Sequence, residues 1–408
     1  MNIQCLRCKG RGFCGRDFCP ILAKSNAMFK VKNNLTKEDF LGSSPTPFVG
    51  HYGYPFLNVG ILSIPEIKEN AWEYDAPRHW AINNYKIPEI VDFRSSLINS
   101  RFKVHAHDMN KLLEISQEVG MAEKPVDIEV SLEEKPKFRL NTDSHLMPMG
   151  PNAQLKKAEI ISNPKIPTKV DKVVSDNDLK ANDALLYLYE NNFDETFLTR
   201  LLSVGTLGLK RNRKLVPTRW SITAIDDTIA KHLIEEIKQF QEIDYSAYFG
   251  SYLGNYYLVL CFPGPWTYEL FETYLPKASW NKSDETSFMT DYENYNGRKT
   301  YAENCAGGYY SVRLAILEKL KQIKRQGTIL VLRFITGEYA VPLGVWVTRE
   351  AARKAMDSNP ITFSDKELML KYANALINKK FGYNLDNLLK QSIILKNLES
   401  QTRLFNFF

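Results

Sequence analysis

Four cysteines lie within the first 20 residues of this 408-residue chain, in the spacing C-x2-C-x5-C-x4-C. They are Cys5, Cys8, Cys14 and Cys19, and the glycines between them allow the tight turns that such short loops need. Four thiolates at this spacing can surround one tetrahedral Zn²⁺ ion, whereas a segment this small cannot bury a hydrophobic core. The spacing therefore predicts a zinc knuckle whose metal supplies most of its folding free energy.

Two other uses of four cysteines stay open at this point. Two disulfides would require an oxidising compartment, but the N-terminus has Cys and Arg where a signal peptide has an apolar segment. An iron–sulfur cluster also uses four thiolates, and the spacing favours zinc without excluding iron. The remaining cysteines, Cys261 and Cys305, are isolated in the sequence, so we expect them to pack in the core.

The positive charge of the chain is concentrated around the cysteine cluster. The net charge is +6, and residues 1–40 hold eight basic and three acidic side chains, so they account for +5. Four of the basic residues lie between the cysteines: Arg7, Lys9, Arg11 and Arg16. Basic side chains contact phosphates, and Phe13 and Phe18 could stack on bases. Two interpretations fit this segment. It could contact a nucleic acid, or it could be a purely structural metal site whose basic side chains face water.

The composition excludes several classes of protein. Hydrophobic residues make up 44% and charged residues 25%, which is ordinary for a globular protein. No apolar run approaches the roughly 18 residues that a membrane-spanning helix needs. We therefore expect a cytoplasmic protein and no membrane partner, and we set aside the membrane, secreted and fibrous classes. The length predicts two or three folded units.

Strand and helix patterns alternate irregularly, which favours an α+β fold: a mixed sheet with packed helices, the zinc knuckle and a flexible C-terminal tail. Strands are predicted within 43–65, 126–132, 256–262 and 328–335. Helices are predicted within 84–121, 176–191, 226–240, 309–325 and the last 45 residues. The predicted domains are a basic knuckle at 1–40, an α+β domain with a bridging region at 41–172, a second α+β domain at 173–390 and a tail at 391–408.

The end of the chain reads QTRLFNFF, an unusual sequence for an exposed terminus. One helical turn would place Leu404, Phe407 and Phe408 on a single face, with Gln401 one turn earlier. The spacing resembles the clamp-binding box Q-x-x-(aliphatic)-x-x-(aromatic)-(aromatic), the PIP motif of proteins that dock on the replication sliding clamp (PCNA). The alternative is that this tail folds back onto the protein's own core.

Three interior segments combine aromatic, glycine and charged residues in ways that core packing does not require. They are 48–55 with the nearby 76–80 and 92–94, then 211–227, then 291–310. The phrases VPTRWSITAIDD, NGRKTYA, GGYY and PLGVW resemble the archaeal Nre family, in particular the NreA type, over nearly the whole chain. The resemblance implies a DNA-repair factor with a four-cysteine metal site and a clamp-binding tail, here at the cysteines and tail residues named above. It implies no chemical activity.

Basic residues of the second and third segments predict a groove that binds phosphates. They are Arg211, Arg213, Lys214, Arg219, Arg298 and Lys299. Gly307 and Gly308 lead into the predicted helix 309–325, whose free backbone N–H groups would attract an anion. The alternative for two glycines is that they permit close helix packing.

Carboxylates in the same segments allow a catalytic hypothesis. The candidates are Asp226, Asp227, Asp291 and Glu293, with Lys299 to orient water. These are the residue types of a nuclease that uses Mg²⁺ or Mn²⁺, but they also occur as helix caps and salt bridges. We expect Asp226 and Asp227 to start the helix 226–240.

Taken together, the sequence predicts a DNA-repair factor that binds DNA and is recruited to the sliding clamp. The alternative is a metal-dependent, structure-specific nuclease or other DNA-modifying enzyme. A second alternative is a non-catalytic protein scaffold, which would show no salt-dependent affinity for DNA.

Overall fold

The computed structural model describes residues 7–8, 11–13, 19–34, 38–136, 147–276, 278, 280–281 and 283–400. The chain forms two compact units, one of residues 1–229 with 340–343 and one of residues 230–339 with 344–408. The division falls inside a helix, α9 (Thr218–Ile237), and not at the boundary predicted near residue 172. A boundary inside a continuous helix has none of the Pro- and Gly-rich composition by which a linker is recognised in a sequence.

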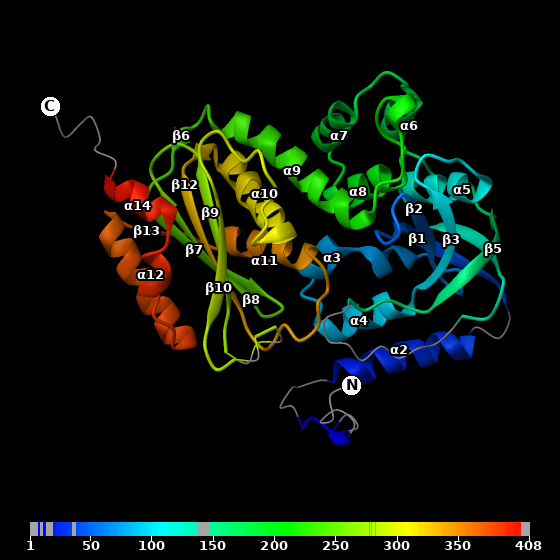
Figure 1. The fold of residues 1–408 in the computed structure, drawn as a ribbon, viewed down its shortest axis with the longest axis horizontal. Helices are drawn as coiled ribbons and strands as arrows, with labels where there is room; N and C mark the ends of the chain where they lie inside the picture. Colours follow the sequence, from blue (N-terminus) through cyan, green and yellow to red (C-terminus); the bar gives the residue numbers. More distant parts are fainter. Residues whose placement is uncertain are drawn as a thin grey trace. The chain divides into compact units, whose positions relative to one another are not determined.

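The first unit is built on a closed β-barrel in the strand order β1-β2-β3-β5-β4 (Figure 1). Its strands are β1 (Asp39–Val49), β2 (Phe56–Ile64), β3 (Ile98–His105), β4 (Val126–Leu132) and β5 (Asn152–Ile160). Neighbouring strands are antiparallel except β3 and β5, which are parallel where Asn99 is opposite Asn152. The region predicted to bridge two domains therefore supplies two strands of the barrel.

The barrel has a hydrophobic interior built by period-2 alternation. Leu57, Val59 and Ile61 of β2 point inward with Phe102 and Val104 of β3, and all five are buried. Such alternation follows from the pleat of a strand, in which successive side chains point to opposite faces. Helix α5 (Lys111–Met121) adds Leu113 and Val119 to the same core.

The first unit has further helices before, between and after the barrel strands in the chain. They are α2 (Pro20–Asn34), η1 (Ala71–Asp75), α3 (Pro77–Ile82), α4 (Ile87–Ser96), α6 (Thr168–Ser175), α7 (Ala181–Glu190), α8 (Glu195–Ser203) and η2 (Lys210–Asn212). The single helix predicted for 84–121 is wrong: α4 and α5 are both present, but β3 lies between them. The helical spacing of residues on either side concealed the alternating strand.

The second unit is a mixed sheet in the order β10-β9-β12-β8-β7-β13, in which β9 and β12 are parallel and the other pairs antiparallel. The strands are β7 (Ser246–Tyr252), β8 (Asn255–Phe262), β9 (Thr267–Tyr274), β10 (Ser287–Glu293), β12 (Thr328–Ile335) and β13 (Ile361–Thr362). A separate two-stranded sheet pairs β6 (Gln241–Glu242) with β11 (Arg325–Gln326). The strands predicted at 256–262 and 328–335 are confirmed.

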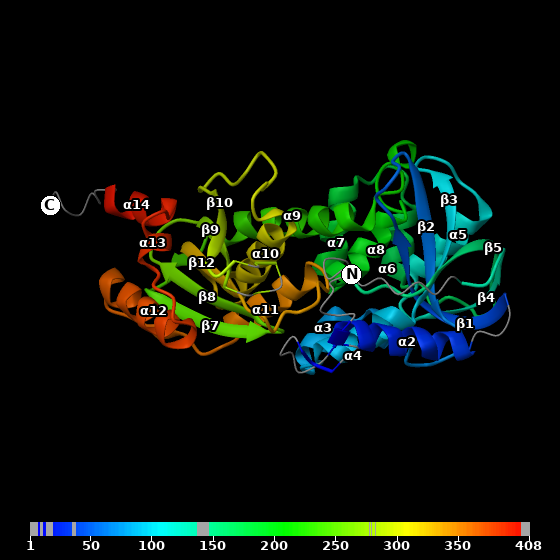
Figure 2. The ribbon, with the colours of Figure 1, turned by 60° about the horizontal axis from the view of Figure 1, so that its bottom comes forward.

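Helices cover both faces of this sheet (Figure 2). α10 (Ala306–Ile323) and α11 (Trp346–Met356) lie on one face. α12 (Lys366–Phe381), α13 (Asp386–Leu389) and α14 (Ile393–Ser400) pack on the other, where Met369, Leu388 and Ile394 join the core. The α+β class is therefore confirmed. Among the residues that the structure describes, no helix is both long and apolar enough to cross a membrane.

Candidate nucleic-acid interface

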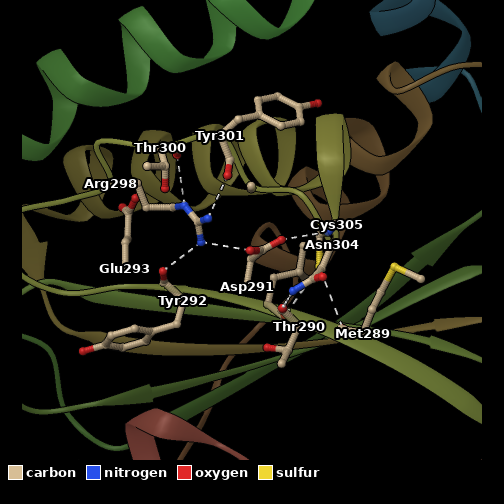
Figure 3. Close-up of polar contacts among 12 residues, drawn as sticks. Met289, Thr290, Asp291, Tyr292, Glu293, Arg298, Thr300, Tyr301, Asn304 and Cys305 are labelled. Atoms are coloured by element: carbon tan, nitrogen blue, oxygen red, sulfur yellow. Dashed lines mark hydrogen bonds and ion pairs between the residues drawn. The ribbon is translucent and has the colours of Figure 1, made fainter.

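The third sequence segment folds around an ion pair in the second unit (Figure 3). Asp291, on β10, accepts a hydrogen bond from Arg298 Nη1 at 2.9 Å through Oδ1. Its other oxygen, Oδ2, accepts the backbone N–H of Cys305 at 2.8 Å. The Arg298 guanidinium also donates to the backbone carbonyls of Tyr292, Thr300 and Tyr301. These contacts hold the segment between β10 and α10 against the strand, and they occupy a basic residue that the sequence assigned to phosphate binding.

The N-terminus of α10 is already supplied with negative charge by the protein itself. Cys305 is the residue that precedes the helix, and Asp291 accepts its N–H, so the carboxylate lies where an anion would bind. Gly308 has a steric role: a Cβ added there would lie 2.4 Å from Glu272 Oε1 on the underlying strand. The alternative predicted for the glycine pair, close packing, is confirmed for Gly308.

Two further ion pairs lie at the contact between α10, which carries Arg313, and the sheet. Arg313 Nη1 donates to Glu293 Oε2 at 2.6 Å, with the side chains 1% and 0% exposed, and Trp266 Nε1 donates to Glu293 Oε1. Glu272 pairs in the same way with Arg333. Burial is the largest influence on the pKa of Arg333 and lowers it, but Glu272 and the neighbouring tyrosines together raise it by more, so the net pKa is raised and the guanidinium stays charged.

The catalytic candidates belong to different units. Asp226 and Asp227 lie within α9 in the first unit; the prediction that they start a helix is wrong, because α9 begins at Thr218. Asp291 and Glu293 lie in the second unit with both oxygens of each carboxylate hydrogen-bonded. A Mg²⁺ or Mn²⁺ ion there would have to replace an arginine. Lys299 is exposed on the same unit.

The two isolated cysteines are buried, as predicted. Cys261 lies on β8 and Cys305 precedes α10, and both are almost fully inaccessible. Burial raises the pKa of the Cys261 thiol to about 12 and also raises that of Cys305. A thiol with a raised pKa is a poor nucleophile, so both residues serve packing.

The first and second sequence segments meet on the first unit. The loop 50–55 connects β1 to β2, and the segment 213–220 passes beside it into α9. Val49 N–H donates to Thr218 Oγ1 at 2.9 Å, and the rings of Tyr54 and Trp220 have centroids 5.6 Å apart. Neither segment was predicted to contact the other, since they are about 170 residues apart in the chain.

Large aromatic side chains are exposed where these segments meet. Tyr52 is 79% exposed, Tyr54 43% and Trp220 47%. Water contact with this much apolar surface is unfavourable, and such groups on a protein surface mark binding sites. All three residues lie in the conspicuous sequence segments 48–55 and 211–227, but no role was predicted for them. For Tyr52 and Tyr54 the available signal was their position in a Gly- and Pro-containing turn, because turns are usually at the surface, whereas Trp220 lies in the first turn of α9.

Three of the predicted phosphate contacts are exposed in the segment that leads to Trp220: Arg211, Lys214 and Arg219. Leu215, which follows Lys214, donates its N–H to Ala106 O at the end of β3 and packs in the barrel core. We call the exposed set Tyr52, Tyr54, Arg211, Lys214, Arg219 and Trp220 the basic–aromatic surface.

Arg213 differs from its neighbours because its side chain is tied to the fold. Its guanidinium donates to the backbone carbonyls of Val174, Asp176 and Gly208, each at 2.8 Å. Burial lowers the pKa of Arg213. A side chain with these partners anchors α6 and the turn after α8, so it is not a phosphate contact.

The cysteine motif is described only in part, and the tail motif lies outside the described residues. Cys8 is buried and its Sγ accepts the Phe13 N–H at 3.3 Å, whereas Cys19 is half-buried. Arg7, Arg11 and Phe13 are exposed. Cys5, Cys14, Lys9, Arg16 and Phe18 lie outside the described residues, and so do Gln401, Leu404, Phe407 and Phe408.

Part of the segment predicted as a tail, 391–408, is a helix. Residues 393–400 form α14, in which Ile394 and Leu395 are buried in the core of the second unit. Glu269 on β9 accepts hydrogen bonds from Ser392 Oγ and from the N–H groups of Ile393 and Ile394. This carboxylate caps α14 and fixes it to the sheet. The predicted clamp motif therefore starts at the residue that follows a fixed helix.

Comparison with known proteins identifies relatives over almost the whole chain. A model of the archaeal Nre N-terminal region matches residues 13–281, and one of the archaeal Nre C-terminal region matches residues 293–407. No solved structure matches the chain.

Three curated proteins are similar along their full lengths. DNA repair protein NreB of Archaeoglobus fulgidus is 37% identical over 402 residues, which cover 98% of this chain and 99% of the relative. DNA repair protein NreA of the same organism is 35% identical, with coverage of 93% and 95%. DNA repair protein NreA of Haloferax volcanii is 35% identical, with coverage of 90% and 88%.

Proposed function

Because the chain belongs to the archaeal Nre family, we propose that it is a DNA-repair protein that binds DNA through the basic–aromatic surface and docks on the replication sliding clamp through residues 401–408. The two family models and the similar proteins confirm the resemblance to the Nre family that the sequence motifs indicated. The repair role rests on the relatives, which are named DNA repair proteins. The two modes of binding rest on this chain's own residues.

One observation carries the DNA-binding part of the proposal: exposed aromatic rings and exposed basic side chains occur on two segments of the first unit, 50–55 and 211–220, that contact each other. Tyr52, Tyr54 and Trp220 offer faces on which bases can stack. Arg211, Lys214 and Arg219 offer positive charge for phosphates. The second unit supplies no comparable set among its predicted contacts, because Arg298 is bound internally and Lys299 remains alone.

Titration of a fluorescent DNA oligonucleotide at several salt concentrations tests this part. Release of counterions by three phosphate contacts should make the logarithm of the affinity fall with the logarithm of salt, with a slope of about −2 to −3. An affinity that does not respond to salt, or no affinity for any DNA, would support the scaffold alternative.

The clamp-docking part rests on the motif and on the fixed helix before it. Glu269 and the buried Ile394 hold α14 on the sheet, and the motif follows this helix directly in the sequence. A short element beside a rigid anchor loses less conformational entropy on binding than a free tail. Recruitment to a clamp would raise the local concentration of the protein at DNA.

Deleting residues 401–408 should abolish binding to the clamp and leave the melting temperature nearly unchanged. The triple change Leu404→Ala, Phe407→Ala and Phe408→Ala should have the same effect, whereas Thr402→Ala with Asn406→Ala, at the variable positions of the motif, should not. Surface plasmon resonance with immobilised clamp and thermal denaturation give the two readouts. A large fall in melting temperature would instead place the phenylalanines in the core.

The described part of the cysteine cluster fits a zinc ligand set. Metal thiolates accept hydrogen bonds from backbone N–H groups, and Cys8 Sγ accepts one from Phe13 while it is buried. Cys5, Cys8, Cys14 and Cys19 would hold the ion, which would stabilise the loops between them. Metal analysis of the purified protein should give one zinc per chain, and Cys8→Ser should lower this value. Iron with visible absorbance would support the iron–sulfur alternative.

The nuclease alternative gains no support from the carboxylates that suggested it, because Asp291 and Glu293 are paired with arginines. A single exposed residue tests it without disturbing the fold. If labelled branched DNA is cleaved with Mg²⁺ or Mn²⁺, and Lys299→Ala removes cleavage at an unchanged melting temperature, the protein is an enzyme and Lys299 belongs to its site.

A further inference from the structure

The outer face of β2 and β3 extends the basic–aromatic surface along the barrel. On these strands the inward side chains build the barrel core, and the alternate positions face outward. Phe56 is 54% exposed, Arg101 and Lys103 are exposed, and Asn58 and His105 are half-buried. The pattern Arg-Phe-Lys-Val-His at 101–105 is thus a strand with polar side chains on the outside.

The contacts across the two strands order these side chains. Phe56 lies opposite His105, with ring centroids 5.1 Å apart, and Lys103 Nζ lies 5.9 Å from the centre of the Phe56 ring. Arg101 lies two residues before Lys103 on β3, opposite Gly60 of β2. Asp108, which follows β3, has its Oδ1 3.8 Å from His105 Nδ1. Aromatic rings and cations therefore alternate along the face.

Backbone hydrogen bonds join this face to the basic–aromatic surface. Ala106, which follows β3, donates its N–H to Pro55 O in the loop 50–55 at 2.8 Å. The same residue accepts the N–H of Leu215 at 2.8 Å, which places Lys214 beside the end of β3. The loop, the segment 213–220 and the two strands thus form one continuous surface within the first unit.

The connectivity of the barrel gives independent support. A closed barrel in the order β1-β2-β3-β5-β4, with a helix between β3 and β4, is the arrangement of OB-fold barrels. In that fold, the β2–β3 face and the loop between β1 and β2 bind oligonucleotides. In this chain those positions hold Phe56, Lys103 and the loop with Tyr52 and Tyr54. Topology alone does not establish a function, but here it coincides with exposed aromatic and basic side chains.

We infer that the β2–β3 face and the basic–aromatic surface together bind single-stranded DNA, with bases stacked on Tyr52, Phe56 and Trp220 and phosphates beside Arg101, Lys103 and Arg219. A duplex hides the faces of its bases, so stacking on these rings requires an unpaired strand. The cations on the face favour a polyanion over an apolar partner protein. This inference rests on the proposed function and specifies its ligand.

The test compares an oligo-dT strand, longer than the roughly 4–16 nucleotides that one such barrel covers, with a duplex of equal length. Fluorescence anisotropy of the full-length protein should show tighter binding of the single strand. Tyr52→Ala, Phe56→Ala and Trp220→Ala should each weaken single-strand binding by roughly 5- to 150-fold, as the loss of one stacked base predicts. Duplex binding should change much less.

Trp72→Ala is the matched control. Trp72 is 41% exposed on η1 of the same unit and packs against His79, outside the proposed surface, so its loss should not change the affinity. A second readout is intrinsic fluorescence. Oligo-dT should quench Trp220, and Trp220→Phe should keep most of the affinity while losing this part of the quenching.

The outcomes separate this inference from the proposed function. If the protein binds duplex DNA at least as tightly as oligo-dT, with a salt-dependent affinity, the proposed function holds and the single-strand inference is wrong. If the three aromatic changes weaken binding no more than Trp72→Ala does, the assigned surface is wrong. If neither form of DNA binds, both proposals fail.

Discussion

The two units of this protein use the same residue types in opposite ways. In the second unit, Arg298, Arg313 and Arg333 each pair with a carboxylate. In the first unit, Arg211, Lys214 and Arg219 are exposed near exposed aromatic rings. A buried ion pair must be satisfied internally because its desolvation is costly, whereas an exposed cation remains available to a ligand. A conspicuous sequence motif therefore indicates a ligand site only when its side chains are accessible.

The largest expected effect concerns the buried pair Glu293–Arg313. Glu293→Gln or Arg313→Met should lower the free energy of unfolding by about 3–5 kcal/mol, because each leaves one buried charge without its partner. Urea denaturation followed by circular dichroism measures the loss. The double variant should lose less than the sum of the two single changes. If either single variant is as stable as the wild type but has lost DNA affinity, the second unit holds a ligand site after all.

A smaller effect is expected at the contact between α10 and the sheet. Gly308→Ala should cost about 1–3 kcal/mol, because the new Cβ would lie 2.4 Å from Glu272 Oε1 and the ion pair must shift. Thermal denaturation measures this as a lower melting temperature. Ala306→Gly is the control: Ala306 has a positive φ of 46°, so glycine relieves strain there and stability should change little. An unchanged melting temperature for Gly308→Ala would remove the steric argument for close packing.

The smallest effects distinguish two neighbouring arginines. Arg211→Ala should leave stability unchanged and reduce the slope of the logarithm of DNA affinity against the logarithm of salt by about 0.7–0.9. Arg213→Ala should instead lower the free energy of unfolding by about 1–3 kcal/mol, because three carbonyls lose their donor. If Arg213→Ala weakened DNA binding without a loss of stability, the assignment of Arg213 as a structural anchor would be wrong.

Much of the second unit could be predicted from local patterns. The runs at 256–262 and 328–335 are continuous apolar stretches of strand length, and 309–325 has helical spacing, so each element follows from its own residues. The barrel was harder, because β3 lies between two helices and alternates hydrophobic residues with Arg101 and Lys103. Because that segment was predicted to be a helix, the outer face of β2 and β3 could not be recognised from the sequence.

The sequence by itself determined the family, the α+β class and the two terminal motifs, because these depend on residue identity at short spacing. Only the tertiary structure decided which charged residues are free. Glu272 and Arg333 are 61 residues apart, and Arg213 binds carbonyls 37 and 39 residues away, so no local pattern could pair them. Accessibility depends on which elements pack together, and such long-range packing also places Trp220 beside Tyr54 on the surface.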